Sequence, residues 1–80
     1  MRKTLRSPDH SRLVDVLISS RKAAGLTQDA LARRLKKHQS FVAKYEGGER
    51  RIDVVEFLTV AKALNADPQS LFFAFVEKLG

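Results

Sequence analysis

The 80-residue sequence contains no cysteine and only two histidines. Disulfide bonds, thiolate zinc sites and cysteine nucleophiles are therefore excluded. The histidines, His10 and His38, are too isolated to indicate a metal site, and no glycine-rich phosphate loop or paired carboxylates beside a cleft are evident. We therefore expect a protein that is not an enzyme and that carries neither a metal nor a cofactor.

Long hydrophobic runs are also missing. The apolar stretches, such as residues 71–76, are far shorter than the ~20 residues that span a bilayer, and no signal-peptide core is visible. We expect a flexible basic tail at residues 1–7 and one small domain at residues 8–80, in a bacterial or phage-type cytoplasm and without a membrane partner. A chain of this size has no room for a ligand-sensing domain, so no small-molecule ligand is expected.

Positive charge is in excess, and the excess is concentrated in one segment. The chain has 15 basic and 9 acidic residues, which gives a net charge of +6. Residues 33–51 hold seven basic and two acidic side chains, whereas residues 52–80 carry a net charge of −2. Because an ordinary solvated surface mixes both signs, this segregation favours a polyanionic partner.

Helix start and stop signals predict an all-α fold without strands. Caps are expected at Ser7, Thr27, Asp53 and Asp67, and Asp53 with Glu56 has the spacing of a capping box. The five expected helices cover residues 8–24, 27–35, 39–46, 53–65 and 68–79. Core-facing side chains are expected to be Leu13, Val14, Leu17, Ile18 and Ala24 in the first helix and Val54, Phe57, Leu58, Ala61 and Leu64 in the fourth.

The segment 27–48 contains two short helices beside the basic cluster. On the second, Phe41, Val42 and Tyr45 share an apolar face. The opposite face carries small and hydrogen-bonding side chains, at Gln39, Ser40, Ala43 and Lys44. A helix-turn-helix protein reads the major groove with this division of faces. The aromatic residues could instead stack on single-stranded bases, but their inward periodicity favours the core.

Three segments in register carry a family resemblance. GLTQDALARRL (25–35), QSFVAKYEGGER (39–50) and VVEFLTVAKALNADPQSL (54–71) resemble the lambdoid-repressor-like helix-turn-helix family, of the Cro/cI and xenobiotic-response-element (XRE) type. The matching stretch runs from residue 13 to about residue 71. The resemblance implies a sequence-specific regulator of transcription, typically a repressor, that binds double-stranded DNA as a homodimer.

The resemblance also implies roles for individual residues. Gln39, Ser40 and Lys44 match positions that reach base edges, and Arg21 and Glu46 match a structural ion pair. Gln39 suits adenine, Lys44 suits guanine, and Ala43 leaves room for a thymine methyl group. Gln28 matches a phosphate-contacting glutamine at the start of the second helix. The full set of expected phosphate contacts is Gln28, Arg33, Lys36, Lys37, His38, Gly48, Arg50 and Arg51.

Two features depart from the family pattern. The turn between the second and third helices usually has a glycine, a buried aliphatic residue and a Ser or Thr cap, but here it is Lys36-Lys37-His38. We expect Lys36 to adopt a left-handed conformation, Lys37 to stay out of the core, and His38 to replace a better cap. The loop at residues 49–52 is short, which affects how Arg50 and Arg51 map onto phosphate contacts.

The last helix, residues 68–79, is expected to form a dimer interface. It carries more large apolar side chains than one core-facing stripe needs, at Leu71, Phe72, Phe73, Phe75, Val76 and Leu79. Burial of all of them within the monomer is the alternative. A two-fold dimer would read half-sites about 34 Å apart on DNA.

Two other functions remain open from the sequence. An antitoxin or a restriction-modification controller that represses its own promoter would use the same DNA-binding surface. A helical protein-interaction module would instead present its basic face to an acidic protein. Binding that weakens steeply with salt on random duplex DNA would favour a DNA-binding protein.

Overall fold

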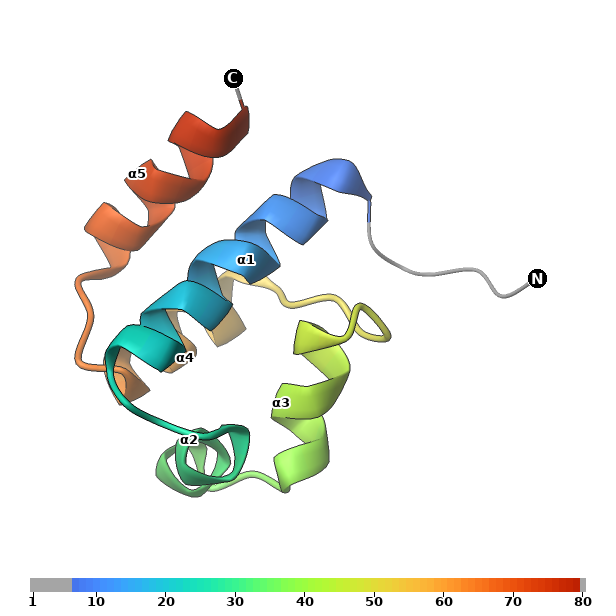
Figure 1. Ribbon diagram of the computed structural model, residues 1–80, viewed down its shortest axis with the longest axis vertical. Coiled ribbons are helices and arrows are strands. Elements are labelled where there is room, and N and C mark those ends of the chain that lie inside the picture. The colour runs from blue at the N-terminus through green and yellow to red at the C-terminus, as the bar shows by residue number, and fades with distance from the viewer. Residues whose placement is uncertain (1–6, 80) are drawn as a thin grey trace.

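The computed structural model describes residues 7–79, which form five helices and no strand (Figure 1). The helices are α1 (Pro8–Ala23), α2 (Gln28–Leu35), α3 (Gln39–Glu46), α4 (Val54–Ala63) and α5 (Pro68–Leu79). The predicted all-α fold is confirmed, with boundaries that differ from the expected ones by at most two residues. The expected basic tail falls almost entirely on residues 1–6, outside the described residues. None of the described helices is long and apolar enough to cross a membrane.

Capping residues begin the helices where the sequence predicted. The Ser7 hydroxyl accepts a hydrogen bond from the His10 backbone N–H at 3.0 Å, and the Thr27 hydroxyl accepts one from Ala30 at 3.0 Å. At α4 the capping box is complete, because Asp53 accepts from the Glu56 N–H at 2.7 Å while Glu56 accepts from the Asp53 N–H at 3.0 Å. Each cap satisfies backbone donors that a helix cannot satisfy internally.

The turn between α2 and α3 has the predicted unusual conformation. Lys36 lies in the left-handed region, with φ 57° and ψ 42°, and ends α2. Lys37 is exposed, and its N–H donates to the Ala32 carbonyl at 3.0 Å. His38 caps α3 by accepting from the Ser40 N–H through Nδ1 at 3.1 Å. The turn therefore closes without the usual glycine, buried aliphatic residue and hydroxyl cap.

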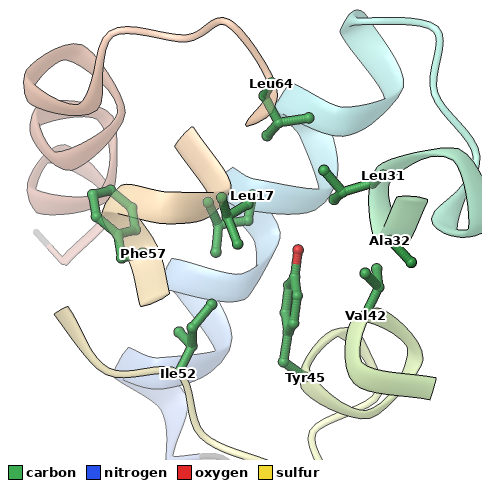
Figure 2. Close-up of a cluster of buried hydrophobic side chains, with 9 residues drawn as sticks. Leu17, Leu31, Ala32, Val42, Tyr45, Ile52, Phe57 and Leu64 are labelled. Carbon is green, nitrogen blue, oxygen red and sulfur yellow. The ribbon is translucent and has the colours of Figure 1, made fainter. Parts of the chain in front are cut away.

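The core lies between α1, α2, α3 and α4. Tyr45 points from α3 toward Leu17 and Leu31, and Ile52 lies to one side of its ring (Figure 2). The buried cluster consists of Leu17, Leu31, Ala32, Val42, Tyr45, Ile52, Phe57, Val60 and Leu64. α5 packs against α1 and α4 but contributes no fully buried side chain. The interior is thus formed by the first four helices and the loop before α4.

Three expected core residues are exposed. Ala24 is the residue at which the chain leaves α1, so its methyl group faces solvent. Val54 and Leu58 are 74% and 44% exposed, so the expectation that α4 buries them is wrong. The face of α4 that meets the core is formed by Phe57, Val60, Ala61 and Leu64. Val54 lies in the first turn of α4 and Leu58 lies beside this face, so both border α5 instead.

Val16 is buried although the sequence did not indicate it. It lies on a face of α1 that borders Leu71 and Ala74 of α5. Packing of α5 along α1 therefore covers a second side of α1. A single helical stripe does not reveal such a face, because it depends on where a distant helix docks.

Replacement of Tyr45 by phenylalanine should stabilise the protein. The side chain is fully buried, burial raises its pKa, and its hydroxyl oxygen has no hydrogen-bond partner in the described part of the chain. An unsatisfied buried hydroxyl costs about 1–3 kcal/mol, so Tyr45→Phe should raise the free energy of unfolding by roughly 1 kcal/mol. Urea denaturation measures the change. Tyr45→Leu is the control that should destabilise, because it leaves a cavity; a Phe variant less stable than wild type would contradict the interpretation.

Candidate nucleic-acid interface

The two faces of α3 differ as the sequence predicted. Val42 and Tyr45 are buried, and Phe41 is half-buried with its ring 5.5 Å from that of Tyr45. On the other face Lys44 is exposed, while the expected base-reading residues Gln39, Ser40 and Ala43 are half-buried. α2 packs against α3 (Figure 1).

A buried ion pair joins the end of α1 to the end of α3. Arg21 Nε lies 2.7 Å from Glu46 Oε2, and Arg21 Nη2 lies 3.0 Å from Glu46 Oε1. The side chains are 10% and 5% exposed. Arg21 also donates to the Leu26 carbonyl at 2.8 Å, and the hydrogen bonds with Glu46 raise its pKa despite burial. The two residues expected to form a structural ion pair therefore do so, and neither is exposed.

Gln28 connects this ion pair to α3. Its Nε2 donates to Glu46 Oε1 at 2.9 Å, and its Oε1 accepts from Gln39 Nε2 at 2.9 Å. The sequence indicated Gln28 only as a phosphate contact and Gln39 only as a base-reading residue. Their hydrogen bond was not predicted, because the two residues lie in different helices with no regular spacing between them.

Arg50 is engaged within the protein. Its Nη1 and Nη2 donate to Glu56 Oε1 and Oε2 at 3.0 and 2.6 Å, and Nη1 also donates to the Arg51 carbonyl at 2.8 Å. The guanidinium carbon lies 4.8 Å from the centre of the Phe41 ring, and Lys37 Nζ lies 5.3 Å from the same ring. These contacts tie the loop before α4 to α3 and to the α2–α3 turn. Arg50 is therefore held by three hydrogen bonds and a ring contact within the protein.

The other expected phosphate contacts are distributed over α2, the α2–α3 turn and the loop after α3. Arg33 pairs with Asp29 at 2.6 Å on the surface of α2. Lys36, Lys37, His38 and Arg51 are exposed, whereas Gly48 is buried at the end of α3. Arg34 was given no role in the sequence analysis. It donates to the Ala63 carbonyl at 2.9 Å and so stabilises the C-terminal end of α4.

The expected dimer residues form an apolar surface together with α4. Four of them are exposed: Phe72 by 53%, Phe73 by 65%, Val76 by 44% and Leu79 by 39%. The other two, Leu71 and Phe75, are half-buried. A groove between α4 and α5 is lined by Val54, Phe57, Leu58, Pro68, Gln69, Phe72, Phe73 and Val76. The sequence missed the contribution of α4, because Val54 and Leu58 were expected to be in the core.

Loss of the Glu56 carboxylate charge should lower the free energy of unfolding most at neutral pH. Hydrogen bonds from Arg50, and then from the Asp53 N–H, lower the pKa of Glu56 to about 2. Because this pKa lies below the unfolded value, the stabilisation is present above about pH 5 and disappears as the pH falls toward 2. Glu56→Gln should therefore be less stable than wild type at pH 7, and the difference should shrink at pH 3.

Thermal unfolding at both pH values measures this effect. Asp29→Asn is the matched control: it breaks the Arg33–Asp29 pair, whose side chains are 78% and 56% exposed, and should change stability little at either pH. A difference between wild type and Glu56→Gln that stays constant from pH 7 to pH 3 would contradict the assignment.

Comparison with known proteins identifies the family. A helix-turn-helix family model matches residues 17–71. An XRE-family like protein from Pseudomonas syringae pv. tomato is 40% identical, with a TM-score of 0.83 over 90% of this chain and 88% of that chain. The restriction-modification controller protein C.AhdI from Aeromonas hydrophila is 32% identical, with a TM-score of 0.73 over 81% of this chain and 98% of that chain.

A third structure extends the comparison at the level of the fold alone. The clp gene regulator ClgR from C. glutamicum is 19% identical and has a TM-score of 0.81 over 94% of this chain and 97% of that chain. None of the curated proteins matches the sequence. The family match spans α2, the turn and α3, and it includes the Arg21–Glu46 pair. The chain therefore belongs to the XRE-type (Cro/cI-like) helix-turn-helix family of DNA-binding transcriptional regulators.

Proposed function

We propose that the protein is a sequence-specific repressor that binds a two-fold operator as a homodimer, with α3 in the major groove of double-stranded DNA. The observation that carries this proposal is the arrangement of α3. Its inner side chains, Val42 and Tyr45, are buried in the core, while Gln39 donates a hydrogen bond to Gln28 and Lys44 is exposed. A helix held rigidly from within, with a polar outer face, suits base reading.

Base recognition is divided among a few side chains in this proposal. The Gln39 amide reads adenine, Lys44 donates to guanine, and Ser40 serves either base. Ala43 leaves room for a thymine methyl group. The residues proposed to contact phosphate are Gln28, Arg33, Lys36, Lys37, His38 and Arg51. Gly48 is left out, because it is buried and its N–H donates to the Tyr45 carbonyl at 3.3 Å. Such contacts supply affinity by counterion release and carry little sequence information.

Arg50 has a different proposed role from Arg51, the other arginine of the loop between α3 and α4. Two hydrogen bonds to Glu56 and the Phe41 ring already hold its guanidinium. We assign it to the support of the loop that follows α3, with any phosphate contact secondary to that support. Arg51, which is exposed, remains the better candidate for phosphate.

The apolar surface of α4 and α5 supports the homodimer. Four large side chains of α5, Phe72, Phe73, Val76 and Leu79, are at least 39% exposed, and Val54 and Leu58 continue the surface onto α4. Contiguous exposed apolar side chains on a soluble domain favour an interface. A second copy is the proposed occupant, because one α3 contacts too few base pairs for useful specificity and a two-fold dimer doubles the site.

Control of a restriction-modification system is a second candidate for the biological role. The observation that favours it is the 32% identity to C.AhdI, which is described as a restriction-modification controller. Both candidates use the same operator-binding chemistry. They differ in which promoter the protein regulates.

Selection from a random duplex pool tests DNA recognition. The wild-type protein should enrich a two-fold sequence, Gln39→Ala should lose preference at one base pair in each half-site, and Arg51→Ala should weaken binding to all duplexes about equally. Binding should weaken steeply as salt rises. Absence of any enrichment, or the same uniform loss in both variants, would contradict the proposed division of roles. Salt-independent binding would favour a protein partner for the basic face.

A charge in the α4–α5 groove should separate the proposed dimer. Phe73→Glu places a carboxylate in a groove lined by apolar side chains, and should reduce the solution mass to that of a monomer in analytical ultracentrifugation. Val55→Glu is the matched control. Val55 is 70% exposed on α4 but does not line the groove, so this variant should remain dimeric. A dimeric Phe73→Glu protein would remove the groove from the interface.

A further inference from the structure

We propose that His10 is a positioning residue for DNA binding, because it holds the backbone that carries the Arg51 side chain. The inference rests on the proposed phosphate contact of Arg51. His10 lies in the first turn of α1 and was given no role in the sequence analysis. It is not proposed to touch DNA itself.

The peptide group that follows Arg51 is held at both of its polar ends. Its N–H, which belongs to Ile52, donates to Nε2 of His10 at 3.3 Å. Its carbonyl oxygen, which belongs to Arg51, accepts from Nη1 of Arg50 at 2.8 Å. Because a peptide group is planar, contacts at both ends restrict the rotation of the whole unit. We call His10 and Arg50 together the peptide clamp.

Both members of the peptide clamp are themselves fixed. Arg50 donates to the two carboxylate oxygens of Glu56 on α4 at 3.0 and 2.6 Å, and its guanidinium carbon lies 4.8 Å from the centre of the Phe41 ring on α3. His10 is buried, and its backbone N–H donates to the Ser7 hydroxyl at 3.0 Å at the start of α1. The clamp therefore connects the loop after α3 with α1, α3 and α4 (Figure 1).

The hydrogen bond between Ile52 and His10 has only one possible direction. A backbone N–H is a donor and never an acceptor, so Nε2 of His10 must be unprotonated and must supply a lone pair. The N–H lies in a loop and is buried, so no helical carbonyl serves it. Loss of the acceptor would leave a buried donor unsatisfied. The imidazole is thus the group that keeps this peptide N–H in place.

Arg51 combines a restrained backbone with an exposed side chain. It lies between α3 and α4, outside the hydrogen-bond pattern of either helix. Without the peptide clamp, binding to a phosphate would have to order the backbone as well as the side chain, at a further entropic cost. The buried Ile52 side chain anchors the next residue, whereas His10 and Arg50 orient the peptide group between the two. The clamp therefore prepares Arg51 for phosphate before DNA binds.

A purely structural role for His10 is the alternative, and three substitutions separate the two roles. His10→Phe keeps a buried ring but removes the acceptor. His10→Gln offers a carbonyl oxygen in place of Nε2 and should restore the hydrogen bond. Val14→Ala is the matched control, because Val14 is fully buried one turn later in α1 and its truncation lowers stability. Val14 belongs neither to the clamp nor to the buried cluster that includes Ile52.

The first measurement uses the DNA-free protein. Amide hydrogen exchange followed by NMR should show a protected Ile52 N–H in wild type, in His10→Gln and in Val14→Ala, and an unprotected one in His10→Phe. The Leu64 N–H, which donates to the Val60 carbonyl at 3.0 Å, reports global unfolding and serves as the internal reference. Equal exchange of the Ile52 amide in wild type and His10→Phe would overturn the proposed clamp.

The second measurement determines the affinity for a duplex of random sequence at several salt concentrations. Arg51→Ala should weaken binding about tenfold, because a hydrogen bond to a charged group is lost. It should also reduce the salt dependence by about one phosphate contact for each bound protomer. His10→Phe should weaken binding about fivefold, the order of the cost of ordering the backbone of one residue. His10→Gln and Val14→Ala should bind like wild type.

The double variant provides the decisive comparison. In the Arg51→Ala background, His10→Phe should weaken binding by less than about twofold, because the contact that it positions is already absent. All affinities are measured at a temperature at which thermal unfolding shows each variant to be folded. If His10→Phe does not fold, His10→Asn replaces it, because the shorter side chain does not reach the Ile52 N–H.

The outcomes distinguish the inference from the function on which it rests. Additive effects of His10→Phe and Arg51→Ala would overturn the inference and leave the phosphate contact in place. A loss of affinity in Val14→Ala as large as that in His10→Phe would overturn it as well, because the effect would then follow stability alone. Wild-type affinity in Arg51→Ala would overturn the phosphate contact and the inference together, while the Ile52 exchange would still report the clamp.

Discussion

The Arg21–Glu46 ion pair is the interaction on which the DNA-binding half of the molecule depends. It joins the last turn of α1 to the last turn of α3, and the additional hydrogen bond from Arg21 to the Leu26 carbonyl includes the loop before α2. Removal of either partner would leave a charge buried without compensation, which costs about 3–5 kcal/mol in comparable sites. The pair therefore couples the position of α3 to the stability of the whole domain.

The position of α3 is held by a small hydrophobic core together with polar contacts at its edges. The buried cluster is small, and one side chain, Tyr45, occupies its centre (Figure 2). Polar contacts at the edges supplement it: the Asp53–Glu56 capping box, the Arg50–Glu56 pair and the Arg34 contact with the end of α4. A small domain relies on such contacts because its surface is large relative to the interior it can enclose.

The basic side chains of residues 33–51, which hold most of the excess positive charge, fall into two groups. Arg34 and Arg50 donate to carbonyl or carboxylate groups of the protein, although Arg34 is also exposed. No hydrogen bond to another residue is described for the exposed side chains of Lys36, Lys44 and Arg51. The composition alone counts these side chains equally. Only the structure separates the basic side chains with partners in the protein from those without.

The sequence by itself determined the features that depend on local chemistry. The caps at Thr27 and Asp53 follow from side-chain preferences within a few residues, and the inward face of α3 follows from helical periodicity. The left-handed Lys36 was expected only from the family pattern of the turn, because lysine itself disfavours that conformation. Only the tertiary structure decided the burial of Val16, the exposure of Val54 and Leu58, and the engagement of Gln28 and Arg50. These depend on where α5 docks and on contacts between separate elements, for which neither periodicity nor capping supplies a rule.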